Sequence, residues 1–596
     1  MSRLWHANYD PDVPTSLAPY RDETLVDIVR RSASERPSAA AVRFEGRVTS
    51  YGELLAEAEA FGRGLERLGV GPGDRVALVL PNCPQFIVAE LGAWLVGAIV
   101  APINVTYPDE DIAALINRAG ATTAVVLSSM YDRVRAMQPR TGLRRIVVAY
   151  VRDALPPVTA LLFRLLKERA EGHDVAPAGN DIRMRDLLAL HRGERPRAGP
   201  PKPDEAAVLL PSGGTTGTPK WVAGAHGGLS MSGQQLFVWL RSALEPSDTL
   251  LVPLPLFHVY GLAGIQSLAF TGGLSLTLVA NPRDTGALLR TIRRERPAFL
   301  CAVPTLLTAI MSHPAAERSR DALRSIKLCF SGASPLLAET KKRFEAATGG
   351  VIVEGYSLTE AQMAAVANPV RGEKKVGSVG MPLPDVDLRI VDLETGEREL
   401  LQGEQGEIVI GGRQLMLGYW RQPEETSAVV RQDAAGRRWL YTGDIGYLDE
   451  HGYLFITDRK KELIKVSGYQ VWPREIEEAL AAHPSVLEAG VAAIPDRSRG
   501  EVPKAWVVLR QGARATPTEL RAFCRERLAP YKAPAQVAIV EALPKTAVGK
   551  VLRRKLRELD AGAAPVAEPA GAPGDGSASA PADDSLAAPA DPLPAT

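Results

Sequence analysis

Short apolar segments alternate with helix-like segments over much of the chain, and this alternation constrains the fold more than any other feature. Residues 51–69 have the apolar spacing of a helix, and residues 75–81 form a short apolar run typical of a buried strand. Residues 86–103 are typical of an apolar helix that continues into a strand, and the alternation returns at residues 297–357. It predicts the α/β class, with parallel sheets covered by helices on both faces.

Composition limits the class of protein further. The 596 residues are too many for one hydrophobic core, so we expect at least two domains. A net charge of +1 gives no broad basic surface, and we expect no nucleic-acid partner. The four cysteines are far apart and form no CxxC pair, which argues against a zinc site and favours a reduced, cytoplasmic location.

The apolar run at residues 86–103 is a poor candidate for a membrane span. It carries Glu90, ends around Pro102 and barely reaches the roughly 20 apolar residues that a bilayer requires. The N-terminal residues contain no apolar stretch of the signal-peptide kind. We therefore expect residues 86–103 to lie inside a large domain.

The pattern of predicted secondary structure changes near residue 370 and again near residue 459. Short strands separated by Gly, Pro and acidic turns suggest an antiparallel unit, with a hairpin turn at residues 449–452. We expect a large domain at residues 1–458 and a small α+β domain at residues 459–560. Residues 561–596 are rich in Ala and Pro and contain no basic residue, which predicts disorder.

A strand-like run leads into a loop of small polar residues in VLLPSGGTTGTPK, residues 208–220. Such a loop offers backbone N–H groups and hydroxyls to phosphate oxygens, and Lys220 adds positive charge. The loop is not a Walker A motif, because two residues separate Gly217 from Lys220. The residues alone favour a phosphate-binding loop, with a plain surface turn as the alternative.

Six further segments raise the specificity of this interpretation. Together with SGGTTGTPK, they resemble, in the same order, the motifs of the AMP-forming acyl-CoA synthetases of the adenylate-forming superfamily, and the likeness covers residues 24–559. The family implies a large N-terminal domain of two doubly wound α/β subdomains plus a distorted β-barrel, followed by a small mobile α+β domain. The six segments are PLFHVYG, SGASPL, EGYSLTE, YTGD, DRKKELIKVSGYQVWPREIE and LPKTAVGKVLRR.

The resemblance implies a two-step reaction that uses ATP, Mg²⁺ and coenzyme A. A carboxylate attacks the α-phosphate of ATP to give acyl-AMP and pyrophosphate, and the thiol of coenzyme A then takes the acyl group. By position, Lys550 corresponds to the catalytic lysine, and Glu360 to the Mg²⁺ ligand. His258 lies beside the expected carboxylate site, where positioning suits it better than proton transfer. Read alone, Lys550 would be a solvated lysine, Glu360 part of a helix cap, and His258 structural.

The resemblance also assigns nucleotide, hinge and thiol-tunnel residues. Asp444 would bind the ribose hydroxyls, Lys461 would be the hinge between the domains, and Ser467 and Gly468 would line the coenzyme A tunnel. One departure concerns Trp221, which follows the loop lysine where the family usually has glycine. The residues expected to bind ATP or AMP are Ser212, Gly213, Gly214, Thr215, Thr216, Gly217, Lys220, Gly332, Ala333, Glu354, Gly355, Tyr356, Thr359, Asp444 and Arg459.

Two features favour a long- or medium-chain fatty acid as the substrate. Residues 255–261 lack the Asp with which amino-acid-activating relatives pair the substrate ammonium. Residues 154–172 resemble an insertion of bacterial long-chain fatty acid–CoA ligases. Four of its leucines share one helical face beside three cations, which could rest on a membrane surface or pack against the protein itself. These side chains are Leu161, Leu162, Leu165 and Leu166, with Arg164, Lys167 and Arg169.

Three alternatives remain open from the sequence. An aryl-acid (4-coumarate-like) CoA ligase would use the same chemistry on another acid. A fatty acyl-AMP ligase would pass the acyl group to a carrier protein. An inactive homologue would only bind acyl or nucleotide ligands, against which the presence of Lys550, Glu360 and Asp444 together argues. The oligomeric state cannot be predicted.

Overall fold

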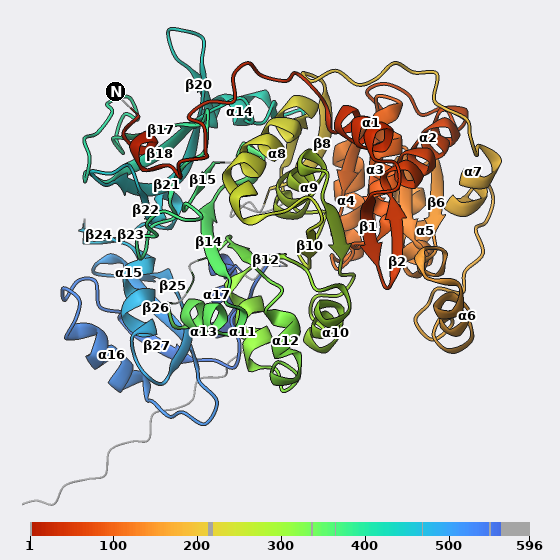
Figure 1. Cartoon of the computed structure of the whole chain (residues 1–596). Coiled ribbons are helices and arrows are strands. Elements are labelled where there is room, and N and C mark those ends of the chain that lie inside the picture. The colour runs from red at the N-terminus through yellow and green to blue at the C-terminus, as the bar shows by residue number, and fades with distance from the viewer. Residues whose placement is uncertain are drawn as a thin grey trace, which may run out of the picture.

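The computed structural model describes residues 3–212, 219–334, 336, 338–363, 365–467, 469–546 and 550–561. They form a large N-terminal part and a small C-terminal part (Figure 1). The predicted tail lies outside the described residues, except that α18 (Glu558–Ala561) includes residue 561. Among the described residues, no helix combines the length and the apolar character needed to cross a bilayer.

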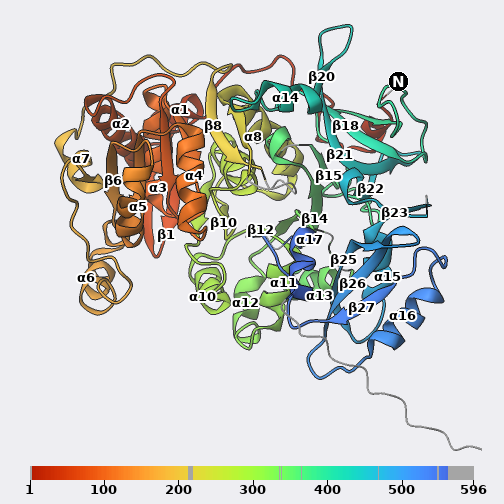
Figure 2. The same ribbon diagram turned by 180° about the vertical axis from the view of Figure 1, so that it is seen from behind.

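The first sheet has the strand order β19-β9-β8-β4-β3-β5-β6-β7. Its central strands are parallel, and Figures 1 and 2 show helices over both faces, as the alternating sequence pattern predicts. The strands are β3 (Arg75–Val79), β4 (Ile99–Pro102), β5 (Thr123–Leu127), β6 (Arg145–Ala149), β7 (Ile182–Arg183), β8 (Ala206–Pro211), β9 (Trp221–Ala225) and β19 (Gly418–Tyr419). Nearby helices are α1 (Leu25–Glu35), α2 (Tyr51–Arg67), α3 (Pro84–Leu95), α4 (Asp109–Ala119), α5 (Tyr131–Met137), α6 (Pro157–Leu166) and α7 (Met184–Leu190).

The second sheet has nine strands in the order β16-β15-β14-β13-β12-β10-β11-β1-β2. The strands are β1 (Ala40–Phe44), β2 (Arg47–Ser50), β10 (Thr249–Val252), β11 (Ser275–Leu278), β12 (Phe299–Ala302), β13 (Leu328–Ser331), β14 (Val351–Tyr356), β15 (Val366–Ala367) and β16 (Met381–Pro382). Its helices are α8 (His226–Leu240), α9 (Ser267–Gly272), α10 (Thr285–Glu295), α11 (Pro304–Ser312), α12 (Arg320–Leu323) and α13 (Ala338–Thr348). Because β13 and β14 are parallel neighbours, the residues after both strands meet at one sheet edge.

The predicted antiparallel unit is a five-stranded sheet, which stands where the distorted barrel was expected. The predicted hairpin is confirmed, because Leu448 pairs with Leu454 and the Asp449 N–H donates to the carbonyl of Tyr453. The strands are β17 (Asp387–Val391), β18 (Gly406–Gly411), β20 (Val430–Gln432), β21 (Arg438–Leu448) and β22 (Leu454–Arg459), and α14 (Pro423–Val429) precedes β20.

The small C-terminal part contains a separate five-stranded sheet in the order β24-β23-β26-β25, with β27 paired to β26. Its strands are β23 (Ile464–Val466), β24 (Tyr469–Val471), β25 (Val486–Asp496), β26 (Gly500–Leu509) and β27 (Gln536–Ile539). Its helices include α15 (Pro473–Ala481), α16 (Pro517–Arg525) and α17 (Arg553–Leu556). The expected boundary between residues 458 and 459 falls at the last residue of β22, just before the 3₁₀ turn Lys460–Glu462, and stays a prediction.

Candidate active site

The ends of the predicted phosphate loop are joined by an antiparallel strand pair. β8 leads into Ser212, whose N–H donates to the carbonyl of Lys220 at 2.8 Å, and β9 leaves at Trp221. Trp221 is buried in extended conformation, and its indole donates to the carbonyl of Leu115, so it needs no left-handed backbone. The predicted Gly213, Gly214, Thr215, Thr216 and Gly217 lie outside the described residues.

The residues after β13 and β14 form a tight corner. The Cα of Gly355 faces the ring of Phe330, and a Cβ there would lie 2.4 Å from a ring carbon. Gly332 is similarly close to the Gly355 carbonyl, at 3.3 Å from an added Cβ. Ala333 has φ of +70°, a strained conformation of the kind that concentrates at ligand sites. Small residues and strain thus occur together where the adenine pocket was predicted.

Asp444 joins this corner to the antiparallel sheet. It lies on β21, is only 3% exposed, and accepts a hydrogen bond from the Tyr356 hydroxyl at 2.6 Å. Its other oxygen binds the Nε of Arg459 at 2.7 Å, across the β21–β22 ladder. The Asp444 charge raises the pKa of Arg459, and burial together with Asp444 raises the pKa of Tyr356 well above its usual value. Three residues predicted to bind the nucleotide are therefore in contact.

Glu360 is held by a residue that the sequence analysis missed. The Tyr419 hydroxyl donates to Glu360 Oε1 at 2.9 Å, and the Met416 N–H donates to the Glu360 carbonyl at 2.8 Å. Burial raises the pKa of the Glu360 carboxyl, and the residue is half-buried. The Lys220 ammonium lies 4.9 Å from the Tyr419 ring centroid and pairs with Glu425 on α14. Tyr419 thus links the loop lysine to the expected metal ligand, although nothing in its sequence setting distinguished it from a packing aromatic.

The Glu360 carboxylate fits Mg²⁺. A hard, half-buried carboxylate with one oxygen fixed by a phenol can supply the single protein ligand that is common when phosphates and water complete the octahedron.

Lys550 comes from the small C-terminal part, and its ammonium is close enough to Arg459 and Asp444 for both charges to act on it. Burial and the Arg459 charge lower its pKa to about 8, while Asp444 acts in the opposite direction. Its backbone is fixed by Thr546, whose N–H donates to the Lys550 carbonyl at 2.8 Å and whose hydroxyl accepts from the Lys550 N–H at 3.1 Å. Lys550 is half-buried, unlike the solvated lysine of the alternative interpretation.

His258 lies between β10 and the π-helix Tyr260–Gln266. Its Nδ1 accepts a hydrogen bond from the Tyr260 N–H at 3.2 Å, which leaves Nε2 to carry the proton of the neutral ring. Burial lowers the His258 pKa to about 4, so the ring is neutral at pH 7. A neutral Nε2–H can donate a hydrogen bond to an anion, which agrees with a positioning role.

The remaining predicted residues lie in different settings. Glu354 pairs with Lys341 at 3.3 Å. Thr359 begins a single 3₁₀ turn, Thr359–Ala361, that also contains Glu360. Lys461 is exposed in the 3₁₀ turn Lys460–Glu462. Ser467 is exposed with φ of +50°, between β23 and β24, and Gly468 lies outside the described residues.

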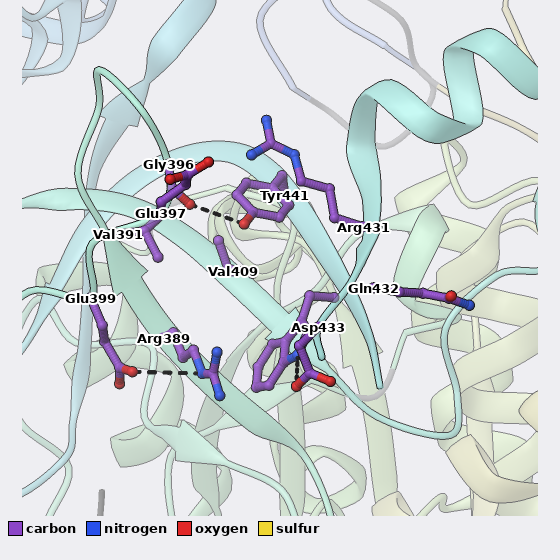
Figure 3. A pocket seen from close by; sticks show the side chains of 11 residues that line it. Arg389, Val391, Gly396, Glu397, Glu399, Val409, Arg431, Gln432, Asp433 and Tyr441 are labelled. Atoms are coloured by element: carbon purple, nitrogen blue, oxygen red, sulfur yellow. Dashed lines mark hydrogen bonds and ion pairs between the residues drawn. The ribbon is translucent and has the colours of Figure 1, made fainter. Parts of the chain in front are cut away.

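A hollow of about 110 Å³ on the antiparallel sheet is separate from these residues (Figure 3). Its cations already have partners. The Arg389 guanidinium lies 3.9 Å from the Trp439 ring centroid and 3.7 Å from Glu399, and that of Arg431 lies 4.1 Å from the ring centroid of Tyr441. No predicted site residue that the structure describes lines the hollow, and we interpret it as a packed sheet face.

Comparison with known families decides the classification. A family model described as AMP-binding enzyme matches residues 29–420. The chain belongs to the AMP-binding enzyme family. A second model, the AMP-binding enzyme C-terminal domain, matches residues 475–550. The family prediction made from seven segments is confirmed.

Relatives of the AMP-binding enzyme family match nearly the whole chain. It is 37% identical over 559 residues to a long-chain-fatty-acid–CoA ligase of Bacillus subtilis, covering 93% of this chain and 97% of that protein. It is 32% identical to 4-coumarate-CoA ligase 1 of Narcissus pseudonarcissus, over 86% of this chain and 89% of that protein. The crystal structure of ATP-bound MatB from Rhodopseudomonas palustris matches with a TM-score of 0.77 and 28% identity, covering 90% of this chain and 98% of that chain. The predicted fold class, α/β with a large N-terminal domain and a small C-terminal domain, is confirmed.

Proposed function

We propose that this protein activates a long- or medium-chain fatty acid with ATP and transfers the acyl group to coenzyme A. The observation that carries the proposal is the position of Lys550 in the small C-terminal part, within electrostatic reach of Arg459 and of Asp444, which also binds Tyr356. A cation poised next to a ribose-binding carboxylate suits the transition state in which a carboxylate approaches the α-phosphate.

In the first step, the substrate carboxylate oxygen attacks the α-phosphorus, and the bond to the pyrophosphate oxygen breaks. Lys550 offsets the repulsion between the two anions, and Lys220 with the loop that begins at Ser212 binds the β- and γ-phosphates. His258 donates its Nε2–H to the substrate carboxylate, which needs no base. Tyr356, Gly332, Ala333 and Gly355 form the adenine pocket, and Asp444 accepts the ribose hydroxyls.

Glu360 would hold Mg²⁺, oriented by the Tyr419 hydroxyl. When bound, the ion would neutralise phosphate charge. Thr359 lies in the same 3₁₀ turn and would contact the phosphate. Glu354 would act only indirectly, because Lys341 holds its side chain.

The second step requires the small domain to move. The thiolate of coenzyme A attacks the acyl carbonyl, and AMP leaves with its phosphate oxygen. We propose that the small C-terminal part rotates about Lys461 relative to the large part. This would withdraw Lys550 and bring Ser467 and Gly468 to a pantetheine tunnel. Lys461 is exposed in the 3₁₀ turn that follows β22, which is compatible with a hinge.

The rate of acyl-AMP formation is expected to fall as the pH rises through about 8. Lys550 carries its charge only below its pKa of about 8, and the reaction needs the charged form. The kcat/KM for ATP, measured from pH 6.5 to 9.5, reports the free enzyme. Lys550→Arg keeps its charge throughout this range, so its profile should lack the alkaline fall. If Lys550→Arg showed an alkaline fall of equal size, the fall would be due to the titration of another group.

The substrate class is tested by AMP release with ATP and Mg²⁺ on acetate, octanoate, palmitate, oleate and cinnamate, each with and without coenzyme A. We expect coenzyme A-dependent turnover that is highest on palmitate or oleate. A maximum on cinnamate would favour the second candidate, an aryl-acid ligase, which the 32% identity to a 4-coumarate-CoA ligase supports. AMP release that does not depend on coenzyme A would point to a carrier protein as the acyl acceptor. No AMP release on any of the acids would point to an inactive binding protein. We further propose a cytoplasmic enzyme with peripheral membrane contact, where long-chain acids partition.

A further inference from the structure

Helix α6 turns its apolar stripe away from the protein. The stripe residues follow the i, i+3, i+4, i+7, i+8 spacing that normally faces a core. In α6 these side chains are 51–73% exposed, while Ala160 and Phe163 on the other side pack against the core. Figures 1 and 2 show α6 projecting from the end of the large part. The stripe consists of Val158, Leu161, Leu162, Leu165 and Leu166.

The protein holds α6 firmly in this orientation. Arg152 Nη1 binds both oxygens of the buried Glu168, at 2.5 and 2.7 Å. The buried His173 contacts the Phe163 ring, with centroids 5.5 Å apart, and its Nδ1 lies 2.7 Å from the hydroxyl of Ser128. A ten-residue helix is marginal by itself, so these contacts fix it. The exposed stripe is therefore built into the fold.

Three exposed cations border the stripe. Arg164 lies within α6, and Lys167 and Arg169 follow its last turn. Glu171 pairs with Lys167 at 3.4 Å, and Glu168 is held by Arg152. Aliphatic side chains beside cations are typical of helices that lie in the headgroup region of anionic membranes, whereas protein interfaces favour aromatic residues, Met and Arg and are depleted in Lys.

We propose that α6, with Arg164, Lys167 and Arg169, docks this protein on an anionic lipid bilayer. The stripe enters the headgroup–acyl boundary, and the cations meet lipid phosphates. The benefit to catalysis rests on the proposed function, because docking would place the enzyme where long-chain acids are dissolved. The docking itself needs no substrate, so it can fail or succeed independently of that function.

The test is co-sedimentation of the full chain with vesicles of phosphatidylcholine alone or with 30% phosphatidylglycerol, without ATP or acid. We expect binding to the anionic vesicles that falls at least 10-fold in a Leu161→Ser, Leu165→Ser, Leu166→Ser variant. Neutralising the cations (Arg164→Gln, Lys167→Gln, Arg169→Gln) should weaken binding to anionic vesicles only. The matched control is Leu401→Ser, which alters a leucine that is 68% exposed outside α6 and should leave binding unchanged.

Two further measurements keep the outcomes distinct. Octanoate is water-soluble, and its turnover should be the same in the wild type and the α6 leucine variant. Failure of the wild type to sediment, or equal sedimentation of that variant, would overturn the proposal. A dimer seen by light scattering that the leucine substitutions dissolve, without lipid binding, would assign the stripe to a second copy of the chain. No AMP release on any acid, together with sedimentation that depends on the α6 leucines, would overturn the proposed function but support the docking proposal.

Discussion

Replacing Lys550 with alanine is expected to slow acyl-AMP formation by roughly 100- to 1000-fold, because one preorganised donor to the transition state is lost. The ammonium lies within electrostatic reach of Asp444 and Arg459, where partial burial strengthens its field on an approaching phosphate. Thioester formation from supplied acyl-AMP and coenzyme A should stay close to the wild-type rate, because the proposed rotation has by then removed Lys550 from the site. Each half-reaction can be followed separately, by pyrophosphate release and by acyl-CoA formation.

Lys545→Ala is the matched control for Lys550→Ala. Lys545 belongs to the same segment but pairs with Glu488 inside the small C-terminal part, so its loss should leave acyl-AMP formation within about threefold of the wild type. Normal acyl-AMP formation by Lys550→Ala would remove Lys550 from the mechanism. Equal loss in both half-reactions would instead argue against a rotation that withdraws it.

The architecture was largely predictable because each element carries its own pattern. The expected helix at residues 51–69 is α2 (Tyr51–Arg67), and the apolar run at residues 86–103 covers most of α3 (Pro84–Leu95) and all of β4 (Ile99–Pro102), with Glu90 fully buried. The long strand β25 was not predicted. Its sequence, VLEAGVAAIPD, contains Gly490 and Pro495 and lacks clear alternation, and the strand owes its length to pairing with β26 along ten residues. Tertiary pairing of this kind leaves little trace in local sequence.

For the candidate site too, some features could be predicted from the sequence and others only from the structure. Motif order identifies Asp444, Arg459 and Tyr356, but only the folded chain shows that their side chains form one hydrogen-bonded cluster. The contact between Tyr419 and Glu360 joins residues 59 positions apart, and the ion pair of Glu354 with Lys341 is equally invisible to a motif. For residues 154–172, the sequence left two interpretations of the leucine face open. In the part of the chain that the structure describes, these leucines are 51–73% exposed and that face is not packed against the protein.

Replacing Asp444 with alanine is expected to lower kcat/KM for ATP by about 100-fold or more, because hydrogen bonds to a buried charge contribute about 1.5–3 kcal/mol each. The substitution removes the acceptor of the ribose hydroxyls and leaves the Arg459 cation without its carboxylate partner. Each Asp444 oxygen keeps a lone pair for a ribose hydroxyl beyond its bond to Tyr356 or Arg459. The specific readout is the preference for ATP over 2′-deoxy-ATP, which the wild type should show and Asp444→Ala should lose.

Two variants separate ribose binding from a general disturbance of the cluster. Tyr356→Phe removes the hydroxyl that donates to Asp444 but keeps the ring, so it should lower kcat/KM for ATP less than Asp444→Ala and retain the preference over 2′-deoxy-ATP. Asp444→Asn keeps the shape and one acceptor, and should show an intermediate preference. Since Asp444 is buried, thermal unfolding of each variant must show that the fold survives. An unchanged preference in a folded Asp444→Ala variant would mean that this carboxylate orders Arg459 and Tyr356 without touching the ribose.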